Sequence, residues 1–318
     1  DISADTGSSA TDFITKTASQ TVTATLSTAL ATGETLQISL NAGTSWANDD
    51  HATADGTSVS IASQTLSGTS QIQFRIIDLA ANAGAVGSQA YTLDTTAPTS
   101  SSAVIATSGT GAANDADVVT LTLDPSETVG TPTCTWTDGD GAMADTSVTY
   151  GTASSDSHTA AVTVDNADQD GTVGFSCTYS DVAGNAIASA ITGTSDSSSV
   201  TIDNTHPAAS AVSIAVSGSG NAQDGDVVTL TIDPSETIGA PTCTWTDGSG
   251  AMADTSVDYG TTGVDSHTAA VTVNNADQDG TVGFSCTFSD SAGNAVAAAV
   301  TALTGGSAIT IDNTHPTV

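Results

Sequence analysis

The sequence predicts an all-β protein built from three β-sandwich domains in series, and two observations lead to this prediction. First, short alternating runs rich in Val, Ile and Thr recur, as in residues 21–26, 36–40 and 72–76, and Gly, Pro and Asp separate them. This pattern is typical of strands joined by turns, and helix-type periodicity is missing throughout. Second, a linker-like phrase at residues 94–98 returns at 203–207 and at 312–316, and both intervals are 109 residues. A fixed period of this length indicates a tandem array of domains.

The three phrases, called here the first, second and third linker, divide the chain into domains at 1–98, 99–207 and 208–318. Each linker follows an apolar strand-like run and ends in proline. Proline cannot donate to a sheet ladder and keeps the preceding residue extended, so each linker should leave the last strand of a domain. Residues 124–136 recur at 233–245, which makes the third domain a near-copy of the second. Strands of the second domain are expected near residues 103–107, 117–123, 132–137, 146–150, 158–165, 172–180 and 198–203.

The charge balance limits the partners of this chain. It has 35 acidic residues against two basic ones, Lys16 and Arg75, for a net charge of −33. Such a surface repels nucleic acid and anionic membranes and attracts cations, so no nucleic-acid partner is expected. No apolar stretch is long enough to span a bilayer, so no direct membrane insertion is expected either. The alternative is that the acidic residues serve solubility alone.

Four cysteines occur as two pairs, Cys134 with Cys177 and Cys243 with Cys286, and the first domain has none. The absence of a CxxC motif argues against zinc. One pair per domain in a strand context predicts one disulfide per domain, and therefore an extracellular location at the cell surface. Two buried free thiols per domain are the alternative.

Residues 170–177, Asp-Gly-Thr-Val-Gly-Phe-Ser-Cys, resemble the strand-F signature of immunoglobulin-like domains. The phrase Asp-x-Ala-Gly-Asn at 181–185 and 290–294, the first linker, and residues 12–15 and 33–34 are similar to tandem immunoglobulin-like repeats of giant prokaryotic surface proteins. These repeats are of the adhesin-extender or surface-layer type. The resemblance implies three tandem immunoglobulin-like β-sandwich domains. It also implies a structural, non-catalytic segment of an adhesin stalk or extracellular filament.

The sequence departs from the immunoglobulin pattern at two positions. Phe175 stands where a corner tyrosine is usual, and Trp136 follows Cys134 by two residues. The disulfide would therefore join strands C and F, whereas strands B and F are joined in antibody domains.

Two other functions are kept as alternatives: a surface-layer or sheath subunit with lateral assembly, and a glycan-binding module that uses Trp46, Trp136 or Trp245. Trp46 is expected to fill the core of the first domain. No catalytic constellation is found, because the carboxylates lie in turns that repeat from domain to domain. The histidines in matching positions are expected to be structural or solvated, and they are His158, His267, His206 and His315.

Calcium is expected at the domain junctions. In a seven-stranded sandwich the AB and EF loops and the end of strand G share one pole, and the BC and FG loops share the other. Calcium takes six to eight oxygens from carboxylates and carbonyls in such loops, and a bound ion would stiffen the junction. The alternative is an acidic pole with diffuse counterions. The expected ligands are Asp94, Asp124, Glu127, Asp181 and Asn185 at the first junction, and Asp115, Asp117, Asp168, Asp170, Asp203, Asp233, Glu236, Asp290 and Asn294 at the second.

A further copy of the junction is expected beyond the third domain, with Asp224, Asp226, Asp277, Asp279 and Asp312 on this side. The third linker and the register of residues 1–7 both match an internal repeat. The expected partners are therefore further repeats, or copies of this chain, arranged head to tail.

Overall fold

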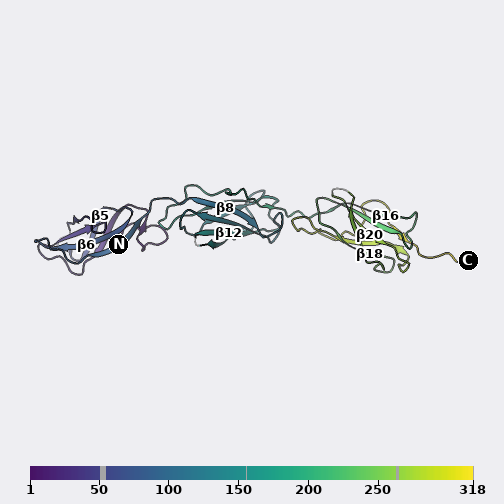
Figure 1. Ribbon diagram of the computed structural model, residues 1–318, viewed down its shortest axis with the longest axis horizontal. Coiled ribbons are helices and arrows are strands. Elements are labelled where there is room, and N and C mark those ends of the chain that lie inside the picture. The colour runs from purple at the N-terminus through teal and green to yellow at the C-terminus, as the bar shows by residue number, and fades with distance from the viewer. Residues whose placement is uncertain (51–54, 155, 263–264, 318) are drawn as a thin grey trace.

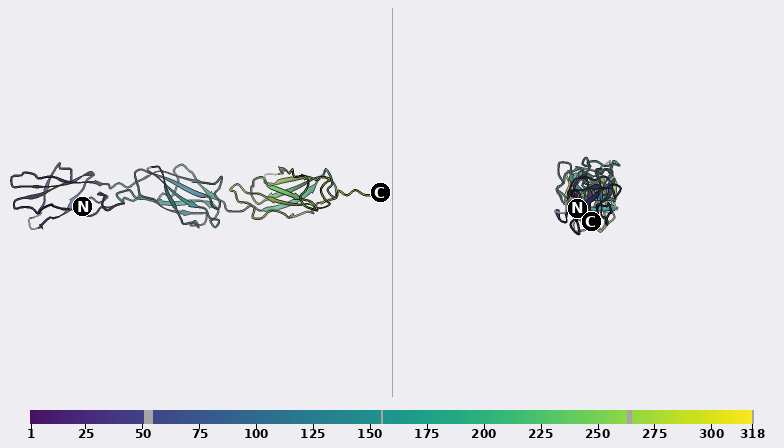
Figure 2. Two further views of the ribbon diagram at one scale, coloured as in Figure 1. Left: turned by 90° about the horizontal axis from the view of Figure 1, so that it is seen from below. Right: turned by 90° about the vertical axis from the view of Figure 1, so that its left-hand side faces the viewer.

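The structure is a computed structural model that describes residues 1–50, 55–154, 156–262 and 265–317. Figure 1 shows three β-rich units in a row, and the end-on view of Figure 2 shows that they lie behind one another. The described residues contain no α-helix. In that part of the chain, no helix could cross a membrane. Three separate apolar cores, one in each unit, run from Ile2 to Tyr91, from Ala103 to Ile202 and from Val212 to Ile311.

The second domain is an immunoglobulin-like sandwich of the constant type. One sheet has the order β11-β12-β9-β8, which corresponds to strands D, E, B and A. The other pairs β10 with β14, and an isolated bridge adds Ile191 beside Cys177, which gives the C-F-G order. The strands are β8 (Ser100–Thr107), β9 (Val118–Pro125), β10 (Thr133–Thr137), β11 (Thr149–Ser154), β12 (Ser157–Thr163), β13 (Gly171–Thr172), β14 (Gly174–Thr178) and β15 (Thr201–Ile202).

Alternation of side chains explains how β9 builds this core. Val119, Leu121 and Leu123 point to one face and are fully buried, whereas the threonines between them are only partly buried. Successive side chains of a strand point to opposite faces, so the Val-Thr-Leu-Thr-Leu run encodes one core face directly.

The third domain repeats this arrangement, with the sheet orders β16-β17-β20-β19 and β18-β22. The register is also the same, since Trp245 faces Phe284 as Trp136 faces Phe175. The strands are β16 (Ala209–Val216), β17 (Val227–Pro234), β18 (Thr242–Thr246), β19 (Asp258–Thr261), β20 (His267–Thr272), β21 (Gly280–Thr281), β22 (Gly283–Thr287) and β23 (Thr310–Ile311).

Both cysteine pairs form disulfides, and each joins facing residues on neighbouring strands of one sheet. Cys134 on β10 lies opposite Cys177 on β14, and Cys243 on β18 lies opposite Cys286 on β22. The bridge therefore links strands C and F. Two residues further along β10, the Trp136 indole is 5% exposed and its centroid lies 6.1 Å from that of the Phe175 ring.

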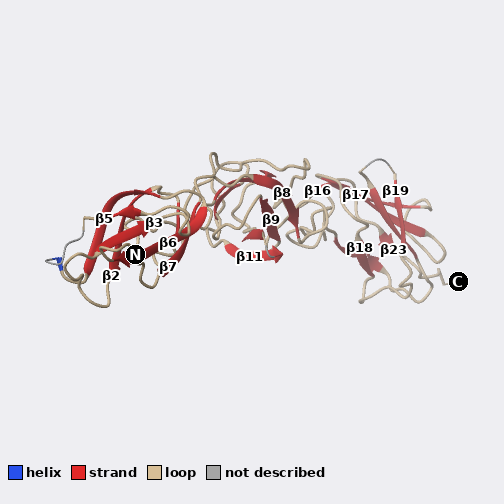
Figure 3. Ribbon diagram, turned by 60° about the vertical axis from the view of Figure 1, so that its left-hand side comes forward, coloured by secondary structure: helices blue, strands red, loops and turns tan. Residues whose placement is uncertain are grey.

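The first domain has the same two-layer design with a different edge (Figure 3). Its sheets have the orders β2-β5 and β1-β7-β6-β3-β4. Ile2 bridges to Val22 on β2, and the chain then crosses to the other sheet, where β1 runs parallel to β7. The strands are β1 (Ile14–Thr15), β2 (Ser19–Thr25), β3 (Thr35–Ser39), β4 (Ala47–Asn48), β5 (Ser58–Thr65), β6 (Thr69–Ile77) and β7 (Gly87–Leu93).

The prediction that Trp46 fills the core of the first domain is wrong. Trp46 is only partly buried, and the Arg75 guanidinium stacks over its ring at 4.1 Å from the centroid. Trp46 precedes the two-residue edge strand β4, where only one face of the ring can be covered by protein. Tyr91 is the buried aromatic residue of this core, and its hydroxyl donates to the Leu40 carbonyl at 2.7 Å.

Candidate metal centres at the domain junctions

Each domain junction brings three carboxylates together. Asp94, Glu127 and Asp181 form the first carboxylate triad, and in each triad the carboxylate oxygens lie within 4.8 Å of one another. The first residue follows the last strand of one domain, and the other two follow strands B and F of the next domain. The second triad consists of the matching residues Asp203, Glu236 and Asp290. Both halves of a junction therefore contribute to each cluster.

An asparagine fixes the loop after strand F to the preceding linker. Asn185 Nδ2 donates to Asp181 Oδ2 at 2.8 Å and to the main-chain oxygen of Asp94 at 2.9 Å. The Asn185 backbone N donates to Asp181 Oδ1 at 2.8 Å. We call this arrangement the asparagine bracket. Its glycine, Gly184, has φ of +92°, a conformation that costs glycine little.

The second junction has the same bracket with the same partners. Asn294 Nδ2 donates to Asp290 Oδ2 at 2.9 Å and to the Asp203 main-chain oxygen at 2.7 Å. Asp290 and Asn294 are 8% and 5% exposed. The Asp-x-Ala-Gly-Asn phrase of the sequence is therefore a linker-binding loop.

Proximity and burial shift the acidity of the triads. Partial burial, and then the charges of Asp94 and Asp181, raise the pKa of the Glu127 carboxyl. At the second junction, partial burial and the neighbouring acids raise the pKa of Glu236 and of Asp203. A carboxyl whose pKa is raised by like charges is one for which a bound cation is a favourable neighbour.

The domains also touch directly beside the triads. At the first junction, Lys16 Nζ donates to the Gly184 carbonyl at 2.5 Å and Thr6 Oγ1 donates to the Ala183 carbonyl at 2.7 Å. At the second, His206 Nδ1 lies 2.8 Å from the Ala295 carbonyl oxygen and Asn114 Nδ2 donates to Asn294 Oδ1 at 3.4 Å. The contacts of Lys16 and Thr6 were missed from the sequence, because those residues carry no repeat signal.

Several residues expected as ligands instead stabilise turns within the second domain. Asp168 is 3% exposed, and its carboxylate accepts from the backbone N of Ala144 and of Asp165. Asp117 accepts from Ser108 and from the Asn114 backbone. Asp170 accepts from the Asn204 backbone and the Thr205 hydroxyl, so it holds the second linker. Asp115, Asp124 and Asp233 are exposed outside the triads.

The residues expected at the far pole of the third domain form the same turns. Asp277 accepts from Ala253 and Asn274, and Asp226 accepts from Gln223 and Ser217. Asp279 accepts from the Asn313 backbone, and Asn313 Oδ1 accepts from the Asp224 backbone at 2.9 Å. Asp312 is exposed, and the described residues form no carboxylate triad at this pole.

Comparison with known proteins found likenesses among solved structures alone. No protein-family model matches it, and no curated protein sequence matches it either. Among solved structures it is similar to the I-band fragment I67–I69 of titin, with 9% identity over 94% of each chain and a TM-score of 0.36. It is also similar to titin domains A168–A170, with 15% identity and a TM-score of 0.34; the match covers 86% of this chain and 89% of that chain. A third similar structure is a tetra-tandem repeat from the extending region of a large adhesion protein, with 17% identity and a TM-score of 0.27. The match covers 94% of this chain and 73% of that chain.

The strand orders and registers of the second and third domains define the class of protein, which is a tandem array of immunoglobulin-like domains.

Proposed function

We propose that the chain is a structural segment of an extracellular cell-surface protein, an adhesin stalk or filament, whose junctions are stiffened by bound calcium. The observation that carries this proposal is the pair of carboxylate triads that span the junctions. Each triad includes a linker aspartate from one domain and two acids from the next domain. A cation held there would connect two rigid units, so its occupancy would control how freely they bend.

The chemistry of the donor set favours a hard divalent ion. Three carboxylates, together with main-chain carbonyls and water, suit calcium, which accepts irregular oxygen cages, better than magnesium, which needs near-ideal octahedral geometry. At the second junction, Asn204 directly follows Asp203 in the sequence. The buried Oδ1 of Asn204 lacks a hydrogen-bond partner among the described residues.

An extracellular location is supported by the disulfides and by the charge. Disulfides persist in oxidising surroundings, and extracellular calcium is plentiful enough to occupy sites of modest affinity. A net charge of −33 keeps such a chain soluble but makes unscreened junctions repulsive.

The test combines calorimetry with small-angle X-ray scattering on the 318-residue chain. We expect two calcium ions per chain, at the triads, with dissociation constants of about 0.1–1 mM, as in extracellular modules. In a chelator the scattering should change from that of a stiff rod to that of a flexible chain of three units. Scattering curves that coincide in calcium and in chelator, with no binding heat, would contradict cation stiffening and leave the triads as solvated acids.

A further inference from the structure

One face of the first domain carries long polar side chains where the second domain carries short ones. Successive residues of a strand point to opposite faces of its sheet. On β6, Ile72 is buried in the core, so the alternate residues Gln71, Gln73 and Arg75 lie on the outer face. Strand β14 has the place of β6 in the second domain, and its outer face carries only glycine, serine and threonine. The sandwich therefore does not require long polar side chains there, which indicates another role for them.

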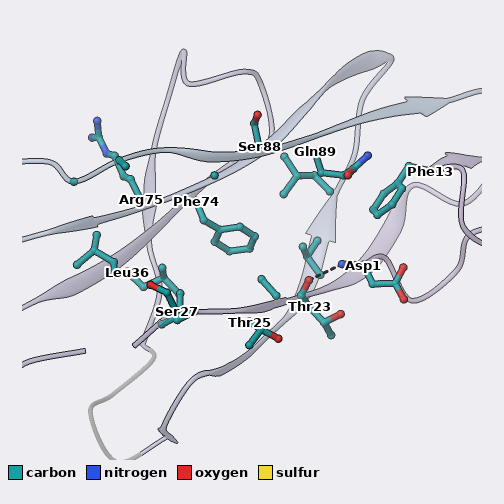
Figure 4. Close-up of a pocket in the computed structure, with 18 residues that line it drawn as sticks. Asp1, Phe13, Thr23, Thr25, Ser27, Leu36, Phe74, Arg75, Ser88 and Gln89 are labelled. Carbon is teal, nitrogen blue, oxygen red and sulfur yellow. Dashed lines mark hydrogen bonds between the residues drawn. The ribbon is translucent and has the colours of Figure 1, made fainter. Parts of the chain in front are cut away.

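The guanidinium of Arg75 is held on this face by two contacts. It stacks over the Trp46 ring, 4.1 Å from the centroid. Its Nε donates to Gln37 Oε1 at 2.7 Å, and Gln37 Nε2 donates in turn to Asn48 Oδ1 at 2.7 Å. Figure 4 shows the guanidinium pointing away from Phe74, which lines a cavity on the core side of the same sheet. We call Trp46, Arg75, Gln37 and Asn48 the Trp46–Arg75 platform.

Arg75 is a cation without an anionic partner in a very acidic chain. The chain has 35 acidic residues, yet within the described ranges no carboxylate pairs with the Arg75 guanidinium. Its two Nη groups have no hydrogen-bond acceptor among those residues either. The other basic residue, Lys16, donates across the first junction to the Gly184 carbonyl. The Nη edge of Arg75 is therefore free to bind a ligand, and a guanidinium edge matches a carboxylate with two parallel hydrogen bonds.

The loop before Trp46 is held in place because its polar groups bond one another. Asn41 Oδ1 accepts from the Ser45 backbone N at 2.9 Å, and Asn41 Nδ2 donates to Ser45 Oγ at 2.8 Å. The Gly43 backbone N donates to Ser39 Oγ at 2.9 Å. A Cβ at Gly43 would lie 3.5 Å from Trp46 Cζ2, so the loop also packs against the ring. A surface that is ordered before binding loses little conformational freedom when a ligand arrives.

The platform lies on the flank of the first domain, away from the first junction. In the sheet order β1-β7-β6-β3-β4, the platform spans β6, β3 and β4, whereas β1 forms the opposite edge. Thr6, Ser8 and Lys16 donate to carbonyls of the second domain. They lie beside β1, since Lys16 directly follows this strand and its backbone N donates to Thr6 Oγ1 at 2.9 Å. A ligand on the platform would therefore leave these junction contacts in place.

The chemistry of the platform suits a sugar that carries a carboxylate. Amides such as those of Asn48 and Gln73 both donate and accept hydrogen bonds, as sugar hydroxyls do. The exposed part of the Trp46 ring can cover the apolar face of a sugar, and the Arg75 fork can bind its carboxylate. A densely charged polyanion or an acidic peptide would be repelled by the net charge of −33, because the platform opposes it with one cation. The carboxylates of the ligand are therefore expected to be sparse.

We propose that the Trp46–Arg75 platform binds an acidic glycan in which neutral sugars separate the uronate residues. The uronate carboxylate accepts from the Nη groups of Arg75, and its ring packs against the exposed part of the Trp46 indole. Its hydroxyls bond to the amides of Asn48 and Gln73. This binding site goes beyond the structural function proposed above and does not depend on calcium, because no carboxylate of the triads takes part in it.

The test is titration of the 318-residue chain with an oligosaccharide of alternating glucuronate and N-acetylglucosamine, followed by calorimetry and tryptophan fluorescence. Trp136 and Trp245 are each 5% exposed, so acrylamide quenching reports mainly on the less buried Trp46. We expect saturable binding in calcium and in chelator alike, with protection of Trp46 from acrylamide. The same oligosaccharide with its carboxyl groups reduced to alcohols should bind about tenfold more weakly, because charge-assisted hydrogen bonds are lost.

Substitutions of Arg75 locate the binding site. Arg75→Gln removes the charge from an outward-facing side chain and should weaken binding of the charged oligosaccharide about tenfold. Arg75→Lys keeps the charge without the planar fork and should bind with intermediate affinity. Gln64→Ala is the control, because it changes an amide on β5 of the opposite sheet and should bind like the parent chain. Thermal melting checks the fold of each variant, and if Arg75→Gln unfolds, the comparison of charged and reduced oligosaccharides decides.

Several results would overturn the proposal. They are a parent chain that does not bind, equal binding of the charged and reduced oligosaccharides, a folded Arg75→Gln chain that binds like the parent, and quenching of Trp46 that the ligand leaves unchanged. Binding that occurs only in calcium would also overturn it, since the carboxylate would then lie on a bound ion. Equally tight binding of a peptide of alternating Glu and Gly would assign the platform to an acidic protein instead. None of these results affects the chelator test of junction stiffness.

Discussion

Replacing Glu236 by Gln should change the second junction in opposite directions with and without calcium. The substitution keeps the side-chain volume and removes one of three carboxylates whose oxygens lie within 4.8 Å of one another. Without a divalent ion, it removes two repulsive pairs, Glu236 with Asp203 and Glu236 with Asp290. With calcium bound, it removes a ligand.

Coulomb's law sets the size of the effect without calcium. Two unit charges 4.8 Å apart repel by about 1 kcal/mol in the dielectric of water and by about 3 kcal/mol at an effective dielectric constant of 20. Glu236 is half-buried and salt screens part of this energy, so the lower value is the appropriate one. Only the Glu236–Asp203 pair spans the junction, because Glu236 and Asp290 belong to the same domain, so the substitution favours the docked junction by about 1 kcal/mol, which corresponds to a change of roughly fivefold in its population.

The assay is small-angle scattering with calorimetry, in chelator and in calcium, on the parent chain and two variants. Glu236→Gln should make the chelated chain stiffer than the parent and should reduce the calcium stoichiometry from two sites to one. Asp233→Asn is the matched control, because it removes one negative charge three residues away, at the end of β17, and Asp233 lies exposed outside the triad. If Glu236→Gln and Asp233→Asn behave alike, or if Glu236→Gln loosens the junction in both buffers, the carboxylate triad does not govern stiffness.

Three further predictions concern the first junction and the effect of pH on the second junction and on the third domain. Gly7→Ala should separate the first two domains, because the new Cβ would lie 1.9 Å from the Val182 carbonyl oxygen; Gly68→Ala, also at positive φ but with open space around it, should leave the scattering unchanged. In chelator, the second junction should tighten as pH falls from 7 towards 5, because its raised pKa values mean that the docked state binds protons more tightly. Circular dichroism should show the third domain losing stability as pH falls from about 4 to 2, because backbone hydrogen bonds, from Gln278 first, lower the pKa of Asp247 to about 2.

The strands of the second and third domains could be predicted because each of their signals is local. The Val-Thr-Leu-Thr-Leu run of β9 predicts which face of the strand is buried, and the repeated prolines indicate where each domain ends. The strands of the first domain are harder to predict from the sequence. Strands β1 and β4 have two residues each, which is too few to show any periodicity. Strand β5, with its alternating Val59 and Ile61, lies outside the predicted runs.

The expected ligands include all six carboxylates of the two triads, but the sequence did not distinguish them from the neighbouring acids that stabilise turns. Asp168 and Asp290 both lie in acidic loops at the same junction, yet the Asp168 carboxylate accepts from backbone N–H groups of turns in its own domain, whereas Asp290 also faces the second linker, which precedes its domain. Aspartate suits both roles because its short carboxylate bonds nearby backbone N–H groups as readily as it binds a cation. The two roles of aspartate are distinguished only by the three-dimensional path of the chain, which places Glu236 and Asp290 beside Asp203 of the second linker.

Magnitudes show what the proposed cation would add to the contacts of the asparagine bracket at a junction. Two carboxylate pairs of the second triad span the junction, Asp203 with Glu236 and Asp203 with Asp290, and at the dielectric of water they repel by about 2 kcal/mol in total. The bond from Asn294 to the Asp203 carbonyl stabilises by about 1 kcal/mol, and the His206 contact adds a similar amount. These contacts fix the direction in which two domains meet, but they only about balance the repulsion. A calcium ion bound at the triad, as we propose, would reverse the sign of that repulsion, so the same geometry would bend at low calcium and hold straight at high calcium.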